Sequence, residues 1–430
     1  MVATAHDSGK RAASAANQAV LAAVVGNVLE WYDFSVYAFV ATILATKFFP
    51  AGNGVTGLLA TFAAYGIGFL ARPLGGIVIG RIGDLRGRKA ALVLTVLLMA
   101  VGTTMIGLIP SYTTIGLAAP ALLVIARLMQ GFSAGGEWGG STAFIVEWAP
   151  ARRRGVYGSF QQASVAAGIL LGSAIAALIS TSLSPAAMDD WGWRVPFLLG
   201  AILGPVGIYL RRNIDETPAF RRVAETRDAS PRATIVSPVR LAARAFGFTI
   251  HWTVVFYIFL AYMPTFTQKY LKLDRVDALW SNTVGILVLV VAIPAFGLLS
   301  DRIGRKPLLL TSCAAFILLP YPLFSHLLSD ASLGGAITMQ ILFGLCIALY
   351  SGPGPAAISE IFPTRIRSTW MTTGYALSVA IFGGFAPFIA TLLIDTTGLP
   401  IAPVFYVMAA SVITTFVVLR LEETAHGELG

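Results

Sequence analysis

The chain has 430 residues, of which 56% are hydrophobic and only 12% are charged. Soluble globular proteins carry about 25% charged residues. This composition, with a mean hydropathy of +0.77, therefore excludes an ordinary soluble domain and indicates an integral membrane protein. The formal net charge of +9 does not indicate nucleic-acid binding, because the basic residues gather in short connections between apolar segments, as the positive-inside rule predicts.

Apolar segments long enough to cross about 30 Å of hydrocarbon recur along nearly the whole chain. Segments of about ten residues in strict alternation, which a membrane β-barrel would need, are not visible in the sequence. The sequence therefore predicts an all-α membrane protein with twelve transmembrane helices. The predicted helices span residues 20–46, 55–80, 90–109, 116–147, 156–183, 194–211, 241–264, 279–299, 307–328, 333–358, 369–395 and 401–420.

Twelve spans place both termini on the same side of the membrane. Most of the 30 Lys and Arg residues then fall on one side, which the positive-inside rule identifies as the cytoplasm. We expect a multi-pass protein of the bacterial inner membrane whose chain divides into five regions. They are a cytoplasmic tail (1–19), a six-helix half (20–211), a cytoplasmic linker (212–240), a second six-helix half (241–420) and a cytoplasmic tail (421–430).

The two halves repeat each other in their charged connections. The segment GRIGDLRGRK begins at Gly80 after the second span, and GLLSDRIGRK begins at Gly297 after the eighth. A second pair, EWAPARRR from Glu147 and EIFPTRIR from Glu360, recurs at nearly the same offset. Two unrelated motifs at one offset predict two pseudo-symmetric halves, a design known among transporters.

The fourth span carries a polar stripe on an otherwise apolar helix, and its glycines allow neighbouring helices to approach closely. Arg127, Gln130 and Glu137 share one helical face. Arg127 lies about 14 Å from the outer end of the span at 1.5 Å per residue, near the membrane midplane. A guanidinium matches a carboxylate in bidentate fashion, so Arg127 and Gln130 are predicted to bind an anionic substrate. A permanent ion pair of Arg127 with Glu30 or Asp33 is the alternative.

Carboxyl groups inside the spans are candidates for proton coupling. Glu30 lies about midway through the first span, and Asp33 flanks its face. A buried carboxyl beside an arginine changes its proton affinity when the site fills. Asp33, Glu30 and Glu137 are therefore the predicted proton carriers, with a role in an inner gate as the alternative for Glu137.

Other polar residues within the spans offer hydrogen bonds to a substrate. An ordinary packing role is the alternative for each of them, and a gating role is a further alternative for Arg72. The additional candidates for substrate binding are Asn27, Tyr37, Arg72, Gln161, Gln162, His251, Tyr257 and Tyr350.

The paired charged loops and the paired E-x-x-P-x-R elements resemble the hallmarks of the major facilitator superfamily, over nearly the whole chain. A narrower set of segments resembles the metabolite:proton symporter family. These are NVLEWYDF (27–34), FLARPLGG (69–76), RLMQGFSAGG (127–136), WGWRVPF (191–197) and ETP (216–218). Within that family, IPSYTTIG (109–116) and the run 128–136 look most like the citrate/tricarballylate branch.

The resemblance implies a secondary active transporter that carries a small organic acid, such as citrate or α-ketoglutarate, by alternating access. It implies no cofactor, with the proton as coupling ion and sodium as an alternative. The expected partners are a small carboxylate, protons and membrane lipid, with no nucleic acid, and the chain is expected to act as a monomer. The charged loops would gate the cytoplasmic end. The predicted gating residues are Asp84, Arg81, Arg88, Glu147, Asp301, Arg305 and Glu360.

A symporter of a zwitterion such as proline or betaine, or of shikimate, is the alternative function. Arg127 would then bind a single carboxylate while aromatic rings bind the cationic end. The second half offers few cations for a citrate trianion, because between Arg244 and Arg420 the Lys and Arg residues lie outside the predicted spans. An enzyme is not expected, because the sequence shows no Walker loop, zinc motif or Cys/His cluster.

Overall fold

The computed structural model describes residues 24–50, 54–86, 88–135, 137–212, 237–425 and 427. Within these ranges the described side chains exclude positions 83, 84, 86, 88–92, 137, 144, 148, 203, 207–212, 364 and 365. The predicted tail 1–19 and most of the predicted linker 212–240 therefore lie outside the described residues. The described part consists of helices and their connections, without a strand, which confirms the all-α prediction.

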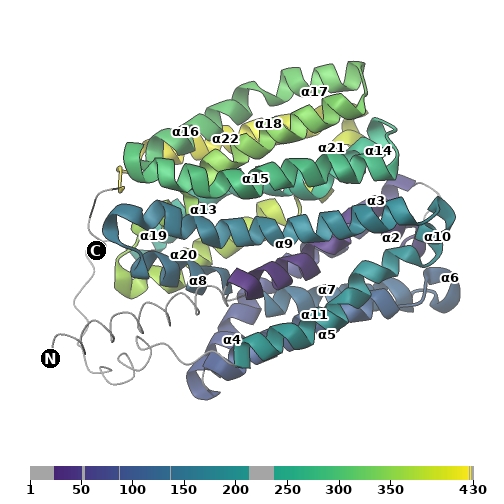
Figure 1. Ribbon diagram of the computed structural model, residues 1–430, viewed down its shortest axis with the longest axis horizontal. Coiled ribbons are helices and arrows are strands. Elements are labelled where there is room, and N and C mark those ends of the chain that lie inside the picture. Colours follow the sequence, from purple (N-terminus) through teal and green to yellow (C-terminus); the bar gives the residue numbers. More distant parts are fainter. Residues whose placement is uncertain are drawn as a thin grey trace, which may run out of the picture.

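The N-terminal half begins with the helix Val24–Phe39, which bends by 64° into α2. Short connections join the helices that follow (Figure 1). Their bounds are α2 Ala41–Phe48, α3 Gly54–Leu70, α4 Arg72–Arg86, α5 Arg88–Leu108, α6 Tyr112–Ile115, α7 Ala118–Ser133, α8 Glu137–Trp148, α9 Arg154–Ser182, α10 Pro185–Asp190 and α11 Val195–Arg212.

The C-terminal half repeats this helical pattern with two π-helical turns, η3 and η4, each placed between two α-helices. The bounds are α13 Pro238–Tyr257, η3 Ile258–Tyr262, α14 Met263–Tyr270, α15 Arg275–Ile303, α16 Arg305–Leu318, α17 Pro320–Ser329, α18 Leu333–Ser351, α19 Gly354–Glu360, α20 Thr364–Ser378, η4 Val379–Gly383, α21 Ala386–Thr397 and α22 Ala402–Leu419.

The described helices correspond to the twelve predicted spans. Eight are single helices long and apolar enough to cross a membrane, and two more spans are bent pairs. One bend, of 40°, lies before Pro320, where proline cannot continue the hydrogen-bond ladder of a straight helix. The remaining two are the shorter apolar helices Val93–Leu108 and Gly192–Val206. The twelve-span prediction is confirmed, and the chain is a multi-pass membrane protein.

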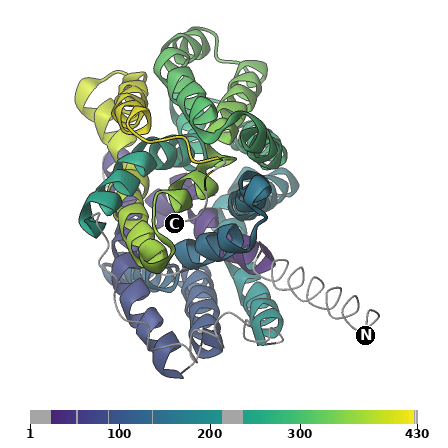
Figure 2. The ribbon, with the colours of Figure 1, turned by 90° about the vertical axis from the view of Figure 1, so that its left-hand side faces the viewer.

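The two halves lie side by side along the bundle (Figures 1 and 2). Helix α9 of the first half packs against α15 of the second. Ser173 and Thr283 share a hydrogen bond of 2.7 Å within this contact, and Trp280 donates to Thr181 at 3.1 Å. Hydrogen bonds of this kind hold apolar helices together where lipid competes equally well for apolar surface.

The span from Pro238 to Tyr270 is the most enclosed helix of the bundle. Within the protein, 94% of its apolar window is buried, against 39% to 56% for the other long single spans. A span surrounded by protein rather than lipid can present polar groups to a cavity. Its π-helical turn η3, like η4 beyond α20, is a helix irregularity that recurs at functional sites. We therefore expect the functional site beside α13 and α20.

The glycines of the fourth span allow the close packing expected from the sequence. A Cβ atom at Gly131 would overlap the backbone of Gly68 on α3, and one at Gly135 would overlap the backbone of Arg72 on α4. Gly140 has nothing within 4 Å of the Cβ position, so close approach is confined to part of the helix. This packing places Arg72 beside α7.

Candidate functional site

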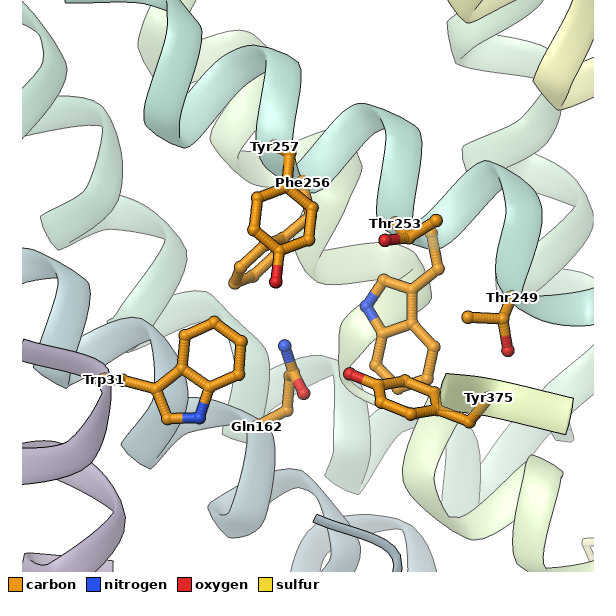
Figure 3. A pocket seen from close by; sticks show the side chains of 8 residues that line it. Trp31, Gln162, Thr249, Thr253, Phe256, Tyr257 and Tyr375 are labelled. Atoms are coloured by element: carbon orange, nitrogen blue, oxygen red, sulfur yellow. The ribbon is translucent and has the colours of Figure 1, made fainter. Parts of the chain in front are cut away.

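A cavity lies between the two halves (Figure 3). The helix Val24–Phe39 and α9 contribute from the first half, and α13 and α20 contribute from the second. The lining residues are Trp31, Gln162, Thr249, Trp252, Thr253, Phe256, Tyr257 and Tyr375. Both halves form its wall, so relative movement of the halves would change its shape and access.

Aromatic rings dominate the lining. Trp31 meets Phe256 edge to face across the two halves, with ring centroids 6.2 Å apart and an interplanar angle of 79°. Trp252 and Tyr375 meet in the same manner at 6.2 Å. None of the eight described lining residues is acidic or basic. The cavity therefore presents π faces and hydroxyl and amide groups rather than fixed charges.

Three lining side chains carry buried polar atoms without a hydrogen-bond partner in the described structure. They are Gln162 through Oε1, Thr253 through Oγ1 and Tyr257 through its hydroxyl oxygen. Thr249, by contrast, donates to the carbonyl of Ala245 at 2.8 Å. A buried polar atom without a partner destabilises the fold by about 1–3 kcal/mol. Three such atoms around one cavity indicate a site completed by a ligand or by water.

The lining residue Tyr375 stacks on Trp138. The two rings lie 3.5 Å apart between centroids and only 4° from parallel. Trp138 comes from α8 of the first half, and Tyr375 from α20 of the second. The stack is therefore a contact between the two halves next to the cavity.

Arg72 lies just behind the aromatic wall. Its side chain is 5% exposed, and its guanidinium carbon lies 4.4 Å from the ring centre of Phe69, 4.8 Å from that of Phe34 and 5.4 Å from that of Trp31. Its Nε has no hydrogen-bond partner in the described structure. Since Trp31 lines the cavity, Arg72 is a cation separated from the cavity by one ring.

Arg127 is fully buried but does not line the cavity. Its Nη1 donates to Gln130 Oε1 at 2.7 Å, and its Nη2 donates to the carbonyl of Tyr65 at 3.4 Å. Its guanidinium carbon lies 4.2 Å from the ring centre of Phe34 and 4.7 Å from that of Tyr37. The ring of Phe34 therefore contacts both arginines.

Asp33 faces away from Arg127, toward α5 and α11. Its side chain is buried, and a Cβ at Gly200 of α11 would lie 2.9 Å from Asp33 Oδ1. Among the described ion pairs there is none between Asp33 and Arg127. Gln130 connects them instead, because its Nε2 donates to the carbonyl of Asp33 at 3.3 Å and to Thr103 Oγ1 at 2.8 Å. Glu30 is half-buried on the same helix as Asp33.

Three predicted substrate ligands of the first half do not line the cavity, and two of them form hydrogen bonds within the bundle. Asn27 donates to Ser164 at 2.7 Å, and Tyr37 donates to the carbonyl of Thr61 at 2.9 Å. Gln161 is buried, and neither amide atom has a partner in the described structure. Their roles in substrate binding stay predictions.

Two of the predicted ligands of the second half also form hydrogen bonds within the bundle. His251 is held between Ser411 at 2.9 Å and Ser312 at 3.2 Å, and Tyr350 donates to the carbonyl of Phe248 at 2.7 Å. Neither side chain lines the cavity. Gln162 and Tyr257 are the predicted substrate ligands that do line it.

At one end of the bundle a cluster of charges joins the two halves; we call Asp301, Arg305 and Glu360 the charged cluster. Arg305 pairs with Asp301 at 2.7 Å and with Glu360 at 3.4 Å. The oxygens of Asp301 also accept from the backbone N–H groups of Gly155 and Val156, at 2.8 and 2.9 Å. These N–H groups belong to the first turn of α9, where a helix leaves its donors free. Asp301 of the second half thus caps a helix of the first.

Two residues that follow α22, Glu423 and Thr424, form hydrogen bonds with the charged cluster and its neighbour Lys306. Glu423 accepts from the backbone N–H groups of Arg305 and Lys306, both at 2.9 Å, and Thr424 donates to Glu360 at 2.6 Å. Burial alone would raise the pKa of Glu423, but the backbone donors outweigh it and hold the pKa of this carboxyl below its usual range. A negative charge at the first turn of α16 is favourable.

Glu147 forms a second link between the halves, through an ion pair of 2.7 Å with the fully buried Arg367 of α20. Arg81, also predicted to gate, is exposed. The side chains of Asp84, Arg88 and Glu137 lie outside those described. The structure thus brings Asp301, Arg305 and Glu360 together, while their gating function stays a prediction.

Sequence reasoning missed most of the aromatic lining. Thr249, Trp252, Thr253 and Phe256 are spaced i, i+3, i+4 and i+7 along α13, which puts them on one helical face. That spacing could have identified the face. Arg367, Thr424 and Glu423 at the charged end were missed as well.

Comparison with known proteins places this architecture in a family. The family described as "Sugar (and other) transporter" matches residues 19–237 and 252–429. The chain belongs to this family of the major facilitator superfamily. Its fold is shared with the xylose transporter XylE of E. coli in a partially occluded inward-open conformation, with a TM-score of 0.78, 18% identity and coverage of 96% of this chain and 99% of the other.

Among curated proteins, the chain is 35% identical to the glycine betaine/proline/ectoine/pipecolic acid transporter OusA of Dickeya dadantii, covering 96% of this chain and 84% of OusA. It is 37% identical to a putative proline/betaine transporter of Staphylococcus haemolyticus (96% and 89%), and 34% identical to the proline/betaine transporter of Escherichia coli K12 (96% and 84%). The superfamily prediction is confirmed. The expected similarity to the citrate/tricarballylate branch is corrected, because these relatives carry names of zwitterion transporters.

Proposed function

We propose that this chain is a proton-coupled symporter of small zwitterions of the glycine betaine and proline type. The observation that carries the proposal is the cavity between the halves, whose eight described lining residues include five aromatic rings and no acid. Desolvated aromatic faces attract a substituted ammonium group by up to about 2 kcal/mol per contact. The names of the similar proteins support the same substrate class.

The carboxylate of the zwitterion would point toward Arg72 and the hydroxyl of Tyr257. Arg72 lies behind the lining ring of Trp31, and both its Nε and the Tyr257 hydroxyl are buried without a partner in the described structure. A carboxylate that reached them would make charge-assisted hydrogen bonds, which are the stronger kind. Arg127, the ligand first expected from the sequence, would instead maintain a positive potential behind Phe34.

A single cation at the cavity favours a zwitterion over citrate. Arg72 is the described cation nearest to the lining, and the lining itself is uncharged. A trianion would bring three charges into a buried site with one nearby counter-charge, and uncompensated buried charge is costly. A zwitterion is therefore the proposed substrate in place of the di- or tricarboxylate expected from the sequence.

Proton coupling would act through Asp33 and Gln130. Asp33 is buried with one oxygen unpartnered in the described structure, and Gln130 joins its backbone to Arg127. Protonation would remove one buried negative charge from the residues that Gln130 connects to Arg127, and it would change the potential that the substrate carboxylate meets. The proton and the substrate would then favour the same conformational change together, which is the requirement for coupling.

Alternating access would use the two six-helix halves as its moving parts, with the charged cluster as the cytoplasmic gate of an inner-membrane protein that acts as a monomer. Breaking the cap of Asp301 on α9, the pair of Glu147 with Arg367 and the Trp138–Tyr375 stack would open one end.

The proposal is tested by uptake into proteoliposomes that contain the purified protein. With an outside-acid pH gradient, labelled glycine betaine and proline are expected to accumulate while labelled citrate does not. Uptake of citrate alone would contradict the substrate class, and zwitterion uptake that follows a sodium gradient but ignores the pH gradient would contradict proton coupling. Arg72→Gln is expected to raise the KM for both zwitterions at least tenfold, as the loss of a charge-assisted bond implies.

A further inference from the structure

The polar atoms around the cavity differ in what they can do chemically. The hydroxyls of Thr253 and Tyr257 can each donate or accept a hydrogen bond. The carbonyl oxygen of the Gln162 amide can only accept. Gln162 is 3% exposed, and its Oε1 has no partner in the described structure. It is therefore the one acceptor-only side-chain atom among the unpartnered atoms of the described lining.

The position of Gln162 places this amide where the cationic end of a zwitterion would lie. Its side chain projects between the rings of Trp31 and Tyr375 (Figure 3), and Trp252 lines the same cavity. These aromatic faces are the groups that attract an ammonium ion. Of the two proposed carboxylate partners, Arg72 lies behind the wall on α4, and Tyr257 lies on α13, so neither belongs to α9, which carries Gln162.

Two kinds of cationic end make opposite demands on this site. A quaternary ammonium carries only methyl groups on nitrogen, so it is held by ring faces and cannot donate a hydrogen bond. The secondary ammonium of a cyclic amino acid carries two N–H bonds, and each loses a bond to water when it enters the cavity. Buried N–H donors need an acceptor, and none of the eight described lining residues supplies a carboxylate.

We propose that Gln162 is the specificity-determining residue of this transporter, accepting a hydrogen bond from substrates whose ammonium carries N–H and contributing little to fully N-methylated substrates. The inference rests on the proposed function and refines it. Removing the Gln162 amide would convert a carrier of both classes into one that selects quaternary ammonium zwitterions.

The experiment compares proline with proline betaine, which keep the same ring and carboxylate and differ only in N–H against N–CH₃. KM for each is measured in proteoliposomes that contain the full chain, for the wild type and for Gln162→Met, which preserves side-chain length but removes the amide. The expected result is a KM for proline raised at least tenfold, as for a lost bond to a charged group, with that for proline betaine changed less than twofold.

Gln268→Met is the matched control, because it makes the same chemical change at an amide on α14 that does not line the cavity. It is expected to leave the ratio of the two KM values unchanged. Retained uptake of proline betaine by Gln162→Met also shows that this variant is folded.

An equal rise of both KM values in Gln162→Met would overturn the inference and leave the proposed function intact, since Gln162 would then serve the shared carboxylate. A wild type that transports neither compound would instead overturn the proposed function. If Gln162→Met is inactive toward both, Gln162→Glu decides: it retains an acceptor, so a preserved or increased preference for proline supports the inference and a lost preference refutes it.

Discussion

The cavity and the charged cluster are both buried and polar, yet they satisfy their polar groups in opposite ways. At the charged cluster, both oxygens of Asp301 and both of Glu360 have partners within the chain. Around the cavity, Gln162, Thr253 and Tyr257 each carry an atom without one in the described structure. The first arrangement stabilises one packing of the halves, and the second leaves hydrogen-bonding capacity for a ligand. Mutations should therefore affect stability at the cluster and affinity at the cavity.

The largest effect on stability is expected for Arg305→Met. This change leaves Asp301 and Glu360 buried without their cation, and breaking a buried ion pair by removing one partner costs about 3–5 kcal/mol. Chemical unfolding in detergent measures the loss. Arg302→Met, at an exposed neighbour, is the control and should change the stability by less than about 0.5 kcal/mol. Equal losses for the two variants would contradict the described cluster.

At the cavity the expected effect is on binding. Trp31→Leu keeps an apolar side chain but removes the π face, so the KM for glycine betaine is expected to rise about tenfold, equivalent to about 1.4 kcal/mol of lost cation–π attraction. Uptake kinetics in proteoliposomes measure it. Leu74→Ala, at an exposed position on α4, should leave the KM unchanged. An unaltered KM in Trp31→Leu would show that the ring does not face the substrate.

A smaller and pH-dependent effect is expected from Glu423. Because its pKa is lowered in the folded protein from the ordinary value of 4.5, its stabilisation is complete at neutral pH and is lost as the pH falls through the folded-state pKa, below 4.5. As a capping side chain it should contribute about 1 kcal/mol. The melting temperature of the wild type should exceed that of Glu423→Gln by a constant amount from pH 7 to about pH 5, and the difference should shrink as the pH falls below 4.5. A difference that stays constant below pH 4.5 would refute the assignment.

The smallest effect on stability is expected for Thr253→Val. This substitution deletes a hydroxyl that has no partner in the described structure, so stability should stay within about 0.5 kcal/mol or rise slightly. Thr424→Val makes the same change at the cluster, where the hydroxyl donates to Glu360 at 2.6 Å, and should cost about 1 kcal/mol. Thermal unfolding of both variants checks the contrast, and a larger loss for Thr253→Val would reverse it.

The sequence predicts the features that depend on the contrast between apolar spans and polar connections. The twelve spans could be located because each is a long apolar segment, and the residues of the charged cluster could be singled out because they are charges in the connections between spans. Arg305, Asp301 and Glu360 belong to motifs that recur in both halves, so their meeting could be expected.

The cavity was harder to predict because its chemistry is aromatic. Trp252 and Phe256 look like core residues until the helices around them are placed. The depth of Arg127 followed from the rise of a helix. The direction of its side chain depends on tertiary packing, and the rings of Phe34 and Tyr37 contact it in a position that the spacing of residues cannot specify.

The π-helical turns just beyond the cavity determine which changes of length its wall can accept. Each holds a residue more than an α-helical turn would, directly after the segments that carry Tyr257 and Tyr375. Because the wider turn absorbs the extra residue, loss of one residue from Ile258–Tyr262 would leave the helix on either side close to its present orientation. Loss of one residue between Trp252 and Phe256, in the regular part of α13, would instead rotate one part of the helix by about 100° relative to the other. These two side chains would then no longer share the cavity face, so deletion of a single codon has opposite consequences one turn apart in the same helix.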